Sequence, residues 1–491
     1  MPSKTFGMKQ KIGLIAGPLL GMMMYGLPLS SLSEEAKALA AILVWVVVFW
    51  ISEAIPLPMT ALLGAAVCVL VGLGTVKQVF ASFAHPIIFL FIGSFFLAEA
   101  VVIHALDQRI ATWLLSLRWA TCSPRRLLFT MGCATALLSM WISNTAAAAI
   151  MVPMVLGVLS MLRGVEAEAE TSEAGALLLI AYGAAAGGIA TMVGTPPNLI
   201  GVGLLTEQAH RTLSFLDWLA VGLPIAGVML VLIYHVLFRL HPLPPTLPLL
   251  QEHVRRLQVQ LGPWTPGQRN ACVALTLAVG LWIFPGLAGA IAGRDHELVV
   301  WLNTRLPKEL VPIVAAGLLF VLPVNFRTGE FTLSWKQAMN INWGTILLFG
   351  GGLTFGHLMV ETSLARSIGE GLVTVFGSST LWNLTAVAIG TALVLTEMAS
   401  NTAAASMLVP VVIAIAQSAN VSPVPPTLGV CLAASLAFVL PVSTPPNAIV
   451  YGTGLVPLLS MIRAGLVLDI MGGIVIWLAL RILCPVLGLS E

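Results

Sequence analysis

Long apolar runs separated by short polar segments dominate the pattern of this 491-residue chain. Because a membrane-spanning helix needs about 20 mostly apolar residues, each run predicts a span. No small-residue cleavage pattern follows the first run, which therefore predicts a retained span rather than a signal peptide. The pattern predicts eleven spans, near 12–29, 37–52, 58–76, 85–103, 176–205, 216–238, 270–291, 310–324, 341–360, 425–456 and 463–484.

Two further apolar runs, at 127–162 and 380–418, behave differently. The first contains no charged residue, and as one helix it would be about 54 Å long, against a bilayer core of about 30 Å. Ser143, Asn144 and Thr145 stand in its middle, and such residues favour helix starts. The run therefore predicts a hairpin that enters the membrane, turns at these residues and leaves by the same face. Non-helical backbone at that depth must be buried in protein or line a cavity.

The chain also contains an internal repeat. WISNTAAAAIMVP at 141–153 recurs as MASNTAAASMLVP at 398–410, an offset of 257 residues. GTPPNLI at 194–200 recurs as STPPNAI at 443–449, an offset of 249 residues. Six consecutive identities and a second shared block argue against coincidence among alanine-rich helices. The span count places Arg109 inside and its counterpart Arg366 outside, so the two halves are inverted, as in many secondary transporters.

Composition and charge narrow the class of protein. With 58% hydrophobic and 9% charged residues, the chain differs from soluble domains, in which about a quarter of residues are charged. A net charge of +2 gives no argument for a nucleic-acid partner. The six cysteines form no CxxC pair and are predicted to be small buried hydrophobes. Lysines and arginines cluster before the first span and after the fourth and sixth, which predicts a cytoplasmic N-terminus and an external C-terminus.

The repeated motifs carry the candidate chemistry. Ser, Asn or Thr of SNT can cap the following alanine helix, and the prolines of TPPN suit a first helical turn. Four helix starts could therefore present N–H groups and positive dipole ends to one anion. Carbonyl, hydroxyl and amide oxygens at the same depth suit sodium. An asparagine amide could bind a cation through its oxygen and a carboxylate through its NH₂, which would couple the two ions.

Other roles are possible for several of these polar residues. Ser and Thr in membrane helices often only bond backbone, but Asn144 and Asn401 at matched tips favour a site. Glu99 has no evident partner. Glu397 could tune a cation site or form an ion pair that holds the hairpin. Glu53 is predicted to be interfacial, as is His85, a cap before Pro86. An intramembrane enzyme lacks support, because HExxH and GxGD are absent, and a channel would not need paired hairpins.

These motifs, together with ISEAIPLPMTALLG at 51–64 and HPIIFLFIGSFFLAE at 85–99, resemble the divalent anion/sodium symporter family over nearly the whole chain. The resemblance implies two sodium sites, with sodium co-transported rather than kept as a cofactor. It assigns the first site to Ser139, Ser143, Asn144 and Gly194, and the second to Thr396, Ala399, Asn401 and Ser443. A dicarboxylate would contact Asn144, Thr145, Ser400, Asn401, Thr402, Thr444 and Pro445. Many members read SNTAT, whereas Ala147 and Ala404 stand here, which leaves the preferred anion open.

The resemblance further implies an all-α, elevator-type transporter with about eleven spans and two re-entrant hairpins. Scaffold helices would occupy 1–126 and 270–378, the moving transport domain 127–240 and 379–491, and a cytoplasmic linker 241–269. The expected protein is a homodimer in the bacterial inner membrane, surrounded by lipid, that imports succinate-like C4-dicarboxylates with sodium. A sodium-independent dicarboxylate exchanger of the same fold, and a citrate or sulfate carrier, are the alternatives.

Overall fold

The computed structural model describes residues 7–29, 32–159, 169–242, 250–293, 296–376 and 380–491. Helices make up most of this part of the chain. A small antiparallel sheet pairs β1 (Pro323–Asn325) with β2 (Glu330–Phe331). Eight helical stretches of the described chain are long and apolar enough to cross a membrane. The prediction of an all-α polytopic membrane protein is confirmed.

The helices follow the predicted repeat. The first half contains α1 (Met8–Gly26), α2 (Glu34–Ser52), α3 (Leu57–Leu70), α4 (Val76–Ala81), α5 (Pro86–Ile103), α6 (Leu106–Leu115), α7 (Pro124–Ser139), α8 (Asn144–Leu159), α9 (Ala169–Gly188), α10 (Pro196–Ala209) and α11 (Phe215–Leu240). After α12 (Leu250–Leu261), the second half contains α13 (Pro266–Ala292), α14 (Glu297–Arg305), α15 (Val311–Leu319), α16 (Trp335–Ala338), α17 (Trp343–Glu361), α18 (Leu364–Phe376), α19 (Leu381–Met398), α20 (Asn401–Ser418), α21 (Val424–Ala434), α22 (Pro445–Gly452) and α23 (Leu458–Val486). By the sequence offsets, α5–α8 correspond to α17–α20, α9 and α10 to α21 and α22, and α11 to α23.

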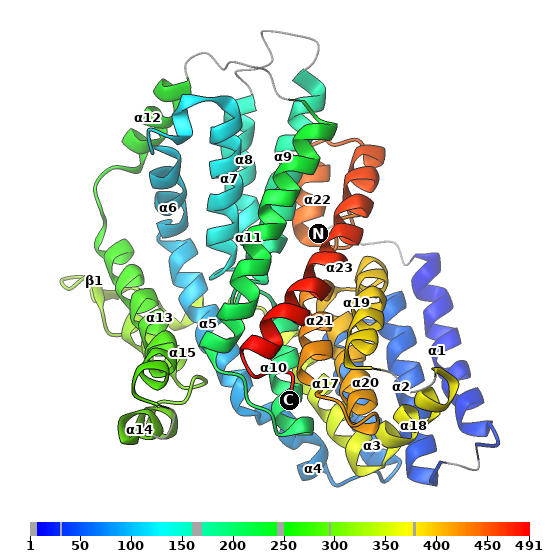
Figure 1. The fold of residues 1–491 in the computed structure, drawn as a ribbon. Coiled ribbons are helices and arrows are strands. Elements are labelled where there is room, and N and C mark those ends of the chain that lie inside the picture. Colours follow the sequence, from blue (N-terminus) through cyan, green and yellow to red (C-terminus); the bar gives the residue numbers. More distant parts are fainter. Residues whose placement is uncertain (1–6, 30–31, 160–168, 243–249, 294–295, 377–379) are drawn as a thin grey trace.

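Both predicted hairpins are present. Helix α7 ends at Ser139 and α8 begins at Asn144, while α19 ends at Met398 and α20 begins at Asn401. Within each pair the two helices pack against each other. In Figure 1 the α7–α8 pair lies in the upper half of the molecule and the α19–α20 pair in the lower half, as an inverted repeat requires. The two TPPN spans are broken as expected, because α9 is separated from α10, and α21 from α22, by non-helical segments.

Two predicted spans are shorter than expected. The run at 58–76 contains α3, which ends at Leu70 just before Gly72, a residue with φ of 85° that L-residues rarely adopt. The run at 310–324 contains α15, whose nine residues span about 14 Å, and then enters β1 at Pro323. Pro323 has no N–H to continue a helix. Neither helix crosses a bilayer core of about 30 Å alone, and the count of eleven complete spans stays a prediction.

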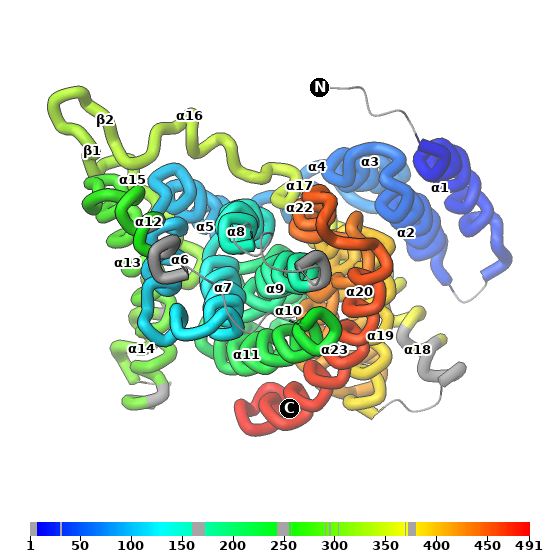
Figure 2. Tube along the Cα trace, turned by 90° about the horizontal axis from the view of Figure 1, so that it is seen from above, coloured from blue at the N-terminus to red at the C-terminus, as the bar shows by residue number. Residues whose placement is uncertain are grey.

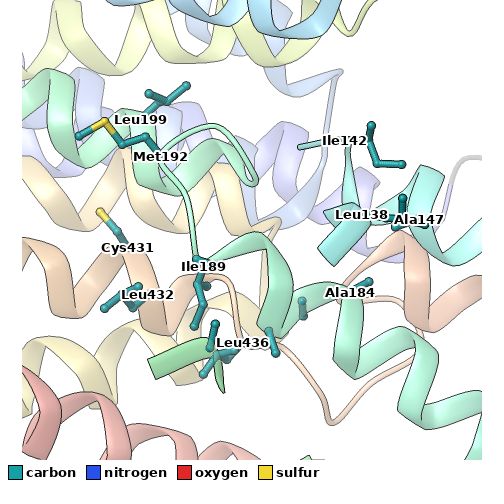
Figure 3. Close-up of a cluster of buried hydrophobic side chains, with 14 of the residues drawn as sticks. Leu138, Ile142, Ala147, Ala184, Ile189, Met192, Leu199, Cys431, Leu432 and Leu436 are labelled. Carbon is teal, nitrogen blue, oxygen red and sulfur yellow. The ribbon is translucent and has the colours of Figure 1, made fainter. Parts of the chain in front are cut away.

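The two repeats interleave in the centre of the molecule. Helix α22 packs against α8 and α9, and α10 packs against α20 and α21. Figure 2 shows α7–α11, α20, α22 and α23 in this central body, with α13–α15 at one end and α1–α3 at the other. Buried side chains from both repeats meet around the helix breaks, among them Leu138, Met192, Cys431 and Leu436 (Figure 3).

Close packing of backbone supports this arrangement. At Gly187 of α9, a β-carbon would lie only 2.1 Å from the carbonyl oxygen of Ala136 on α7, so this helix crossing requires glycine. Three of the six cysteines, Cys68, Cys431 and Cys484, are buried as predicted, whereas Cys122 is exposed. The cysteine prediction is therefore wrong for Cys122, which lies in the segment between α6 and α7.

Candidate functional site

A cavity of about 630 Å³ lies where the two hairpin tips and the two helix breaks meet. The first residues of α8, α10, α20 and α22 all line it, so four helix N-termini face one space. Parts of α3, α5 and α17 complete the wall. All seven residues predicted to contact the dicarboxylate line this cavity: Asn144, Thr145, Ser400, Asn401, Thr402, Thr444 and Pro445.

The SNT motifs form these helix starts as their chemistry predicts. The Ser143 hydroxyl accepts a hydrogen bond from the Ala146 N–H at 3.2 Å, and the Ser400 hydroxyl accepts one from the Ala403 N–H at 3.2 Å. The first-turn N–H groups that remain without helical partners are available to an anion. Thr195 and Thr444, which precede the prolines of TPPN, are extended and make no side-chain cap, so the proline-led helices begin without one.

Oxygen atoms gather behind the first hairpin tip. The Ser139 hydroxyl donates to Asn144 Oδ1 at 2.6 Å, and Ser139 is fully buried. A β-carbon at Gly194 would lie 2.5 Å from the Gly188 carbonyl oxygen and 3.0 Å from that of Ser139. One at Gly188 would lie 2.5 Å from Asn144 Oδ1. The residues predicted for the first sodium site are therefore neighbours, and the Gly188 carbonyl lies among them.

The second tip repeats this geometry. The Thr396 hydroxyl lies 2.8 Å from Asn401 Oδ1 and 2.6 Å from the carbonyl oxygen of Ala434. A hydroxyl has one proton and cannot fully satisfy both acceptors. A cation bound by these oxygens would supply the missing positive charge. Thr396 and Ala399 are buried behind the tip rather than in the cavity wall, whereas Ser443 lines the cavity.

Two asparagines that the sequence reasoning did not single out hold the helix breaks together. Asn198 Nδ2 donates to the carbonyl oxygens of Gly188 at 3.0 Å and Thr191 at 2.7 Å. Asn447 Nδ2 donates to those of Ala437 at 2.9 Å and Leu440 at 3.0 Å. Both asparagines are buried. Each is the last residue of a TPPN motif, so the recurrence of that residue was the signal that could have identified them.

The acidic residues take distinct positions. The Glu397 carboxylate accepts hydrogen bonds from the backbone N–H groups of Val439 at 2.9 Å and Leu440 at 3.1 Å. It therefore holds the second helix break, and within the described part of the chain it forms no ion pair with a basic side chain. Glu53 follows the last residue of α2 and has a left-handed backbone conformation.

The predicted cap is confirmed at His85, where Nδ1 accepts a hydrogen bond from the Ile87 N–H at 3.3 Å.

Comparison with known proteins identifies the family of this chain. The family described as "Sodium:sulfate symporter transmembrane region" matches residues 9–489, almost the whole length. The chain belongs to the sodium:sulfate symporter family. The resemblance drawn from the SNT and TPPN motifs is thereby confirmed. As a member of this symporter family the chain is a membrane transporter and not an enzyme.

Individual relatives agree with the family. The chain is 33% identical to a protein of Staphylococcus saprophyticus named "Sodium-dependent dicarboxylate transporter SdcS", over 99% of this chain and 94% of that relative. It is 34% identical to an uncharacterized transporter of Haemophilus influenzae, over 93% of this chain and 94% of the relative.

Among solved structures, Alcanivorax borkumensis YdaH matches with a TM-score of 0.55 and 17% identity over 98% of each chain. Neisseria gonorrhoeae MtrF matches with a TM-score of 0.57 and 16% identity over 85% of this chain and 84% of MtrF. At these identities the likeness concerns the fold alone.

Proposed function

We propose that this symporter imports C4-dicarboxylates such as succinate together with sodium. The observation that carries the proposal is the convergence of four helix N-termini on one cavity, with an oxygen cluster behind each hairpin tip. The name of the Staphylococcus saprophyticus relative, a sodium-dependent dicarboxylate transporter, supports sodium coupling and a dicarboxylate substrate.

The anion is bound without a basic side chain. Among the residues that the structure describes, those that line the cavity include no Lys, Arg or His. Helix N-termini attract anions, but they offset only part of the cost of bringing a dianion to the middle of a membrane. Sodium ions beside the site supply the remaining positive charge. Sodium is therefore required for binding and is more than a source of energy.

Asn144 and Asn401 couple the two ions. Oδ1 of Asn144 accepts a hydrogen bond from Ser139, and Oδ1 of Asn401 accepts one from Thr396. Both asparagines also line the cavity. A sodium ion on Oδ1 orients the amide so that its NH₂ group can donate to a substrate carboxylate. Each ion therefore lowers the free-energy cost of binding the other.

Transport follows an elevator mechanism. Segments 127–240 and 379–491 contain both hairpins and both broken helices, whose helices pack on one another across the repeats. They move together as the transport domain against a scaffold of 1–126 and 270–378, with 241–269 as the cytoplasmic linker. The working unit is a homodimer in the lipid of the bacterial inner membrane, with the N-terminus inside and the C-terminus outside.

Uptake of labelled succinate into proteoliposomes tests the proposal. Uptake should require sodium, rise cooperatively with its concentration and fail with potassium. Undiminished exchange in sodium-free buffer would overturn sodium coupling and favour the sodium-independent exchanger. Competition by malate, citrate and sulfate identifies the anion class, and strong competition by sulfate or citrate alone would refute the C4-dicarboxylate assignment.

A further inference from the structure

One wall of the cavity carries a negative charge. Ser94, Phe95, Ala98, Glu99 and Val102 form one face of α5, and all five line the cavity. Of the described residues that line the cavity, Glu99 alone is charged. Within the described chain its carboxylate has no ion pair and no hydrogen-bond partner. An acidic side chain without a partner is unexpected beside a site for a dianion, so it needs a functional explanation.

The second repeat has no equivalent charge. At the offset of 257 residues, Glu99 corresponds to Gly356 of α17. A β-carbon at Gly356 would lie 2.1 Å from Gln208 Nε2 and 2.8 Å from Leu204 Cδ2, both on α10. At this position α17 is therefore covered by α10, whereas the matching face of α5 lines the cavity. A carboxylate therefore faces the cavity from the first repeat and not from the second.

We propose that Glu99 tunes the affinities for both ions in the conformation in which the site faces this cavity. Its charge attracts sodium into the cavity and repels the dianion. Glu99 therefore raises the affinity for sodium and lowers the affinity for the dicarboxylate on this side of the membrane. The inference rests on the proposed sodium-coupled dicarboxylate transport, and it assigns Glu99 a role in specificity that is separate from the predicted sodium ligands.

The size of the effect follows from the size of the cavity. A volume of 630 Å³ corresponds to a sphere on the order of 10 Å across. At that distance, one unit charge changes the affinity for a monovalent ion by roughly 2- to 15-fold, for effective dielectric constants between those of water and a protein surface. The effect on a dianion is larger and has the opposite sign. Removal of the carboxylate should thus shift the two affinities in opposite directions.

Equilibrium binding to the purified, detergent-solubilised transporter tests this. Labelled sodium is titrated without succinate, so that the coupling between the two ions does not affect its half-saturation. Labelled succinate is titrated with saturating sodium and without sodium, and choline keeps the ionic strength constant. In Glu99→Gln, half-saturating sodium should rise about 3- to 10-fold, while the succinate Kd at saturating sodium should fall at least as much. Glu99→Asp keeps the charge and should resemble the wild type. Glu35→Gln removes an exposed carboxylate outside the cavity and should change neither value.

The outcomes separate the two proposals. Sodium-independent succinate binding by the wild type would overturn the proposed coupling, and with it the role of Glu99. Sodium-dependent binding by the wild type, with unchanged half-saturating sodium in Glu99→Gln, would overturn the role of Glu99 alone. Weakening of both affinities in Glu99→Gln would also overturn it, because a merely structural residue would act in that way.

Discussion

Gly194→Ala is the most direct perturbation of the first predicted sodium site. The substitution adds one methyl group, which would lie 2.5 Å from the carbonyl oxygen of Gly188 and 3.0 Å from that of Ser139. Both obstacles are backbone atoms, and the Gly188 carbonyl is held by Asn198 Nδ2 at 3.0 Å. The carbonyls must therefore move away from the place where they would bind sodium.

Overpacking of this kind costs about 1–3 kcal/mol. If that cost falls on the sodium-bound geometry, half-saturating sodium for uptake rises about 5- to 140-fold, because 1.4 kcal/mol corresponds to a factor of ten. Uptake of succinate measured against sodium concentration gives this value. Gly227→Ala on α11 is the matched control, since a β-carbon there meets nothing within 4 Å. It should leave the sodium dependence unchanged.

Half-saturating sodium within about twofold of wild type, in a Gly194→Ala protein of normal yield and normal thermal unfolding temperature, would mean that these carbonyls do not bind the ion. A change confined to the unfolding temperature would assign Gly194 a packing role only.

Three further outcomes are expected. Asn144→Ala or Asn401→Ala should reduce uptake to below a tenth of wild type, a loss of at least about 1.4 kcal/mol, with normal folding, and a milder loss would contradict the bridging amides. In a cysteine-free background, cysteines at the exposed positions Arg118 and Arg366 should label from opposite sides of sealed vesicles, and labelling from one side would refute the inverted topology. Glu397→Ala should raise half-saturating sodium by roughly 5-fold or more, as two backbone N–H groups lose their acceptor, and an unchanged sodium curve would exclude that bracing role.

The features that sequence alone determined are local. The apolar runs follow from the absence of water in the bilayer, which forces spans to be long and apolar. The hairpin tips follow from short motifs whose capping chemistry acts within three or four residues, as at Ser143 and Ser400. The repeat needs only the comparison of one segment with another. For these reasons the fold class, the hairpins, the broken helices and the family could all be predicted.

Tertiary structure decided which segments meet. The Gly188 and Ala437 carbonyls lie at the helix breaks because Asn198 and Asn447 fold back and donate to them. Glu99 faces the cavity because the packing of α5 turns that face toward the hairpin tips. Such contacts join residues that are distant in sequence, or depend on the rotation of a helix about its axis. In a span that is apolar all round, no amphipathic stripe indicates which face turns inward, so only packing against neighbouring helices decides it.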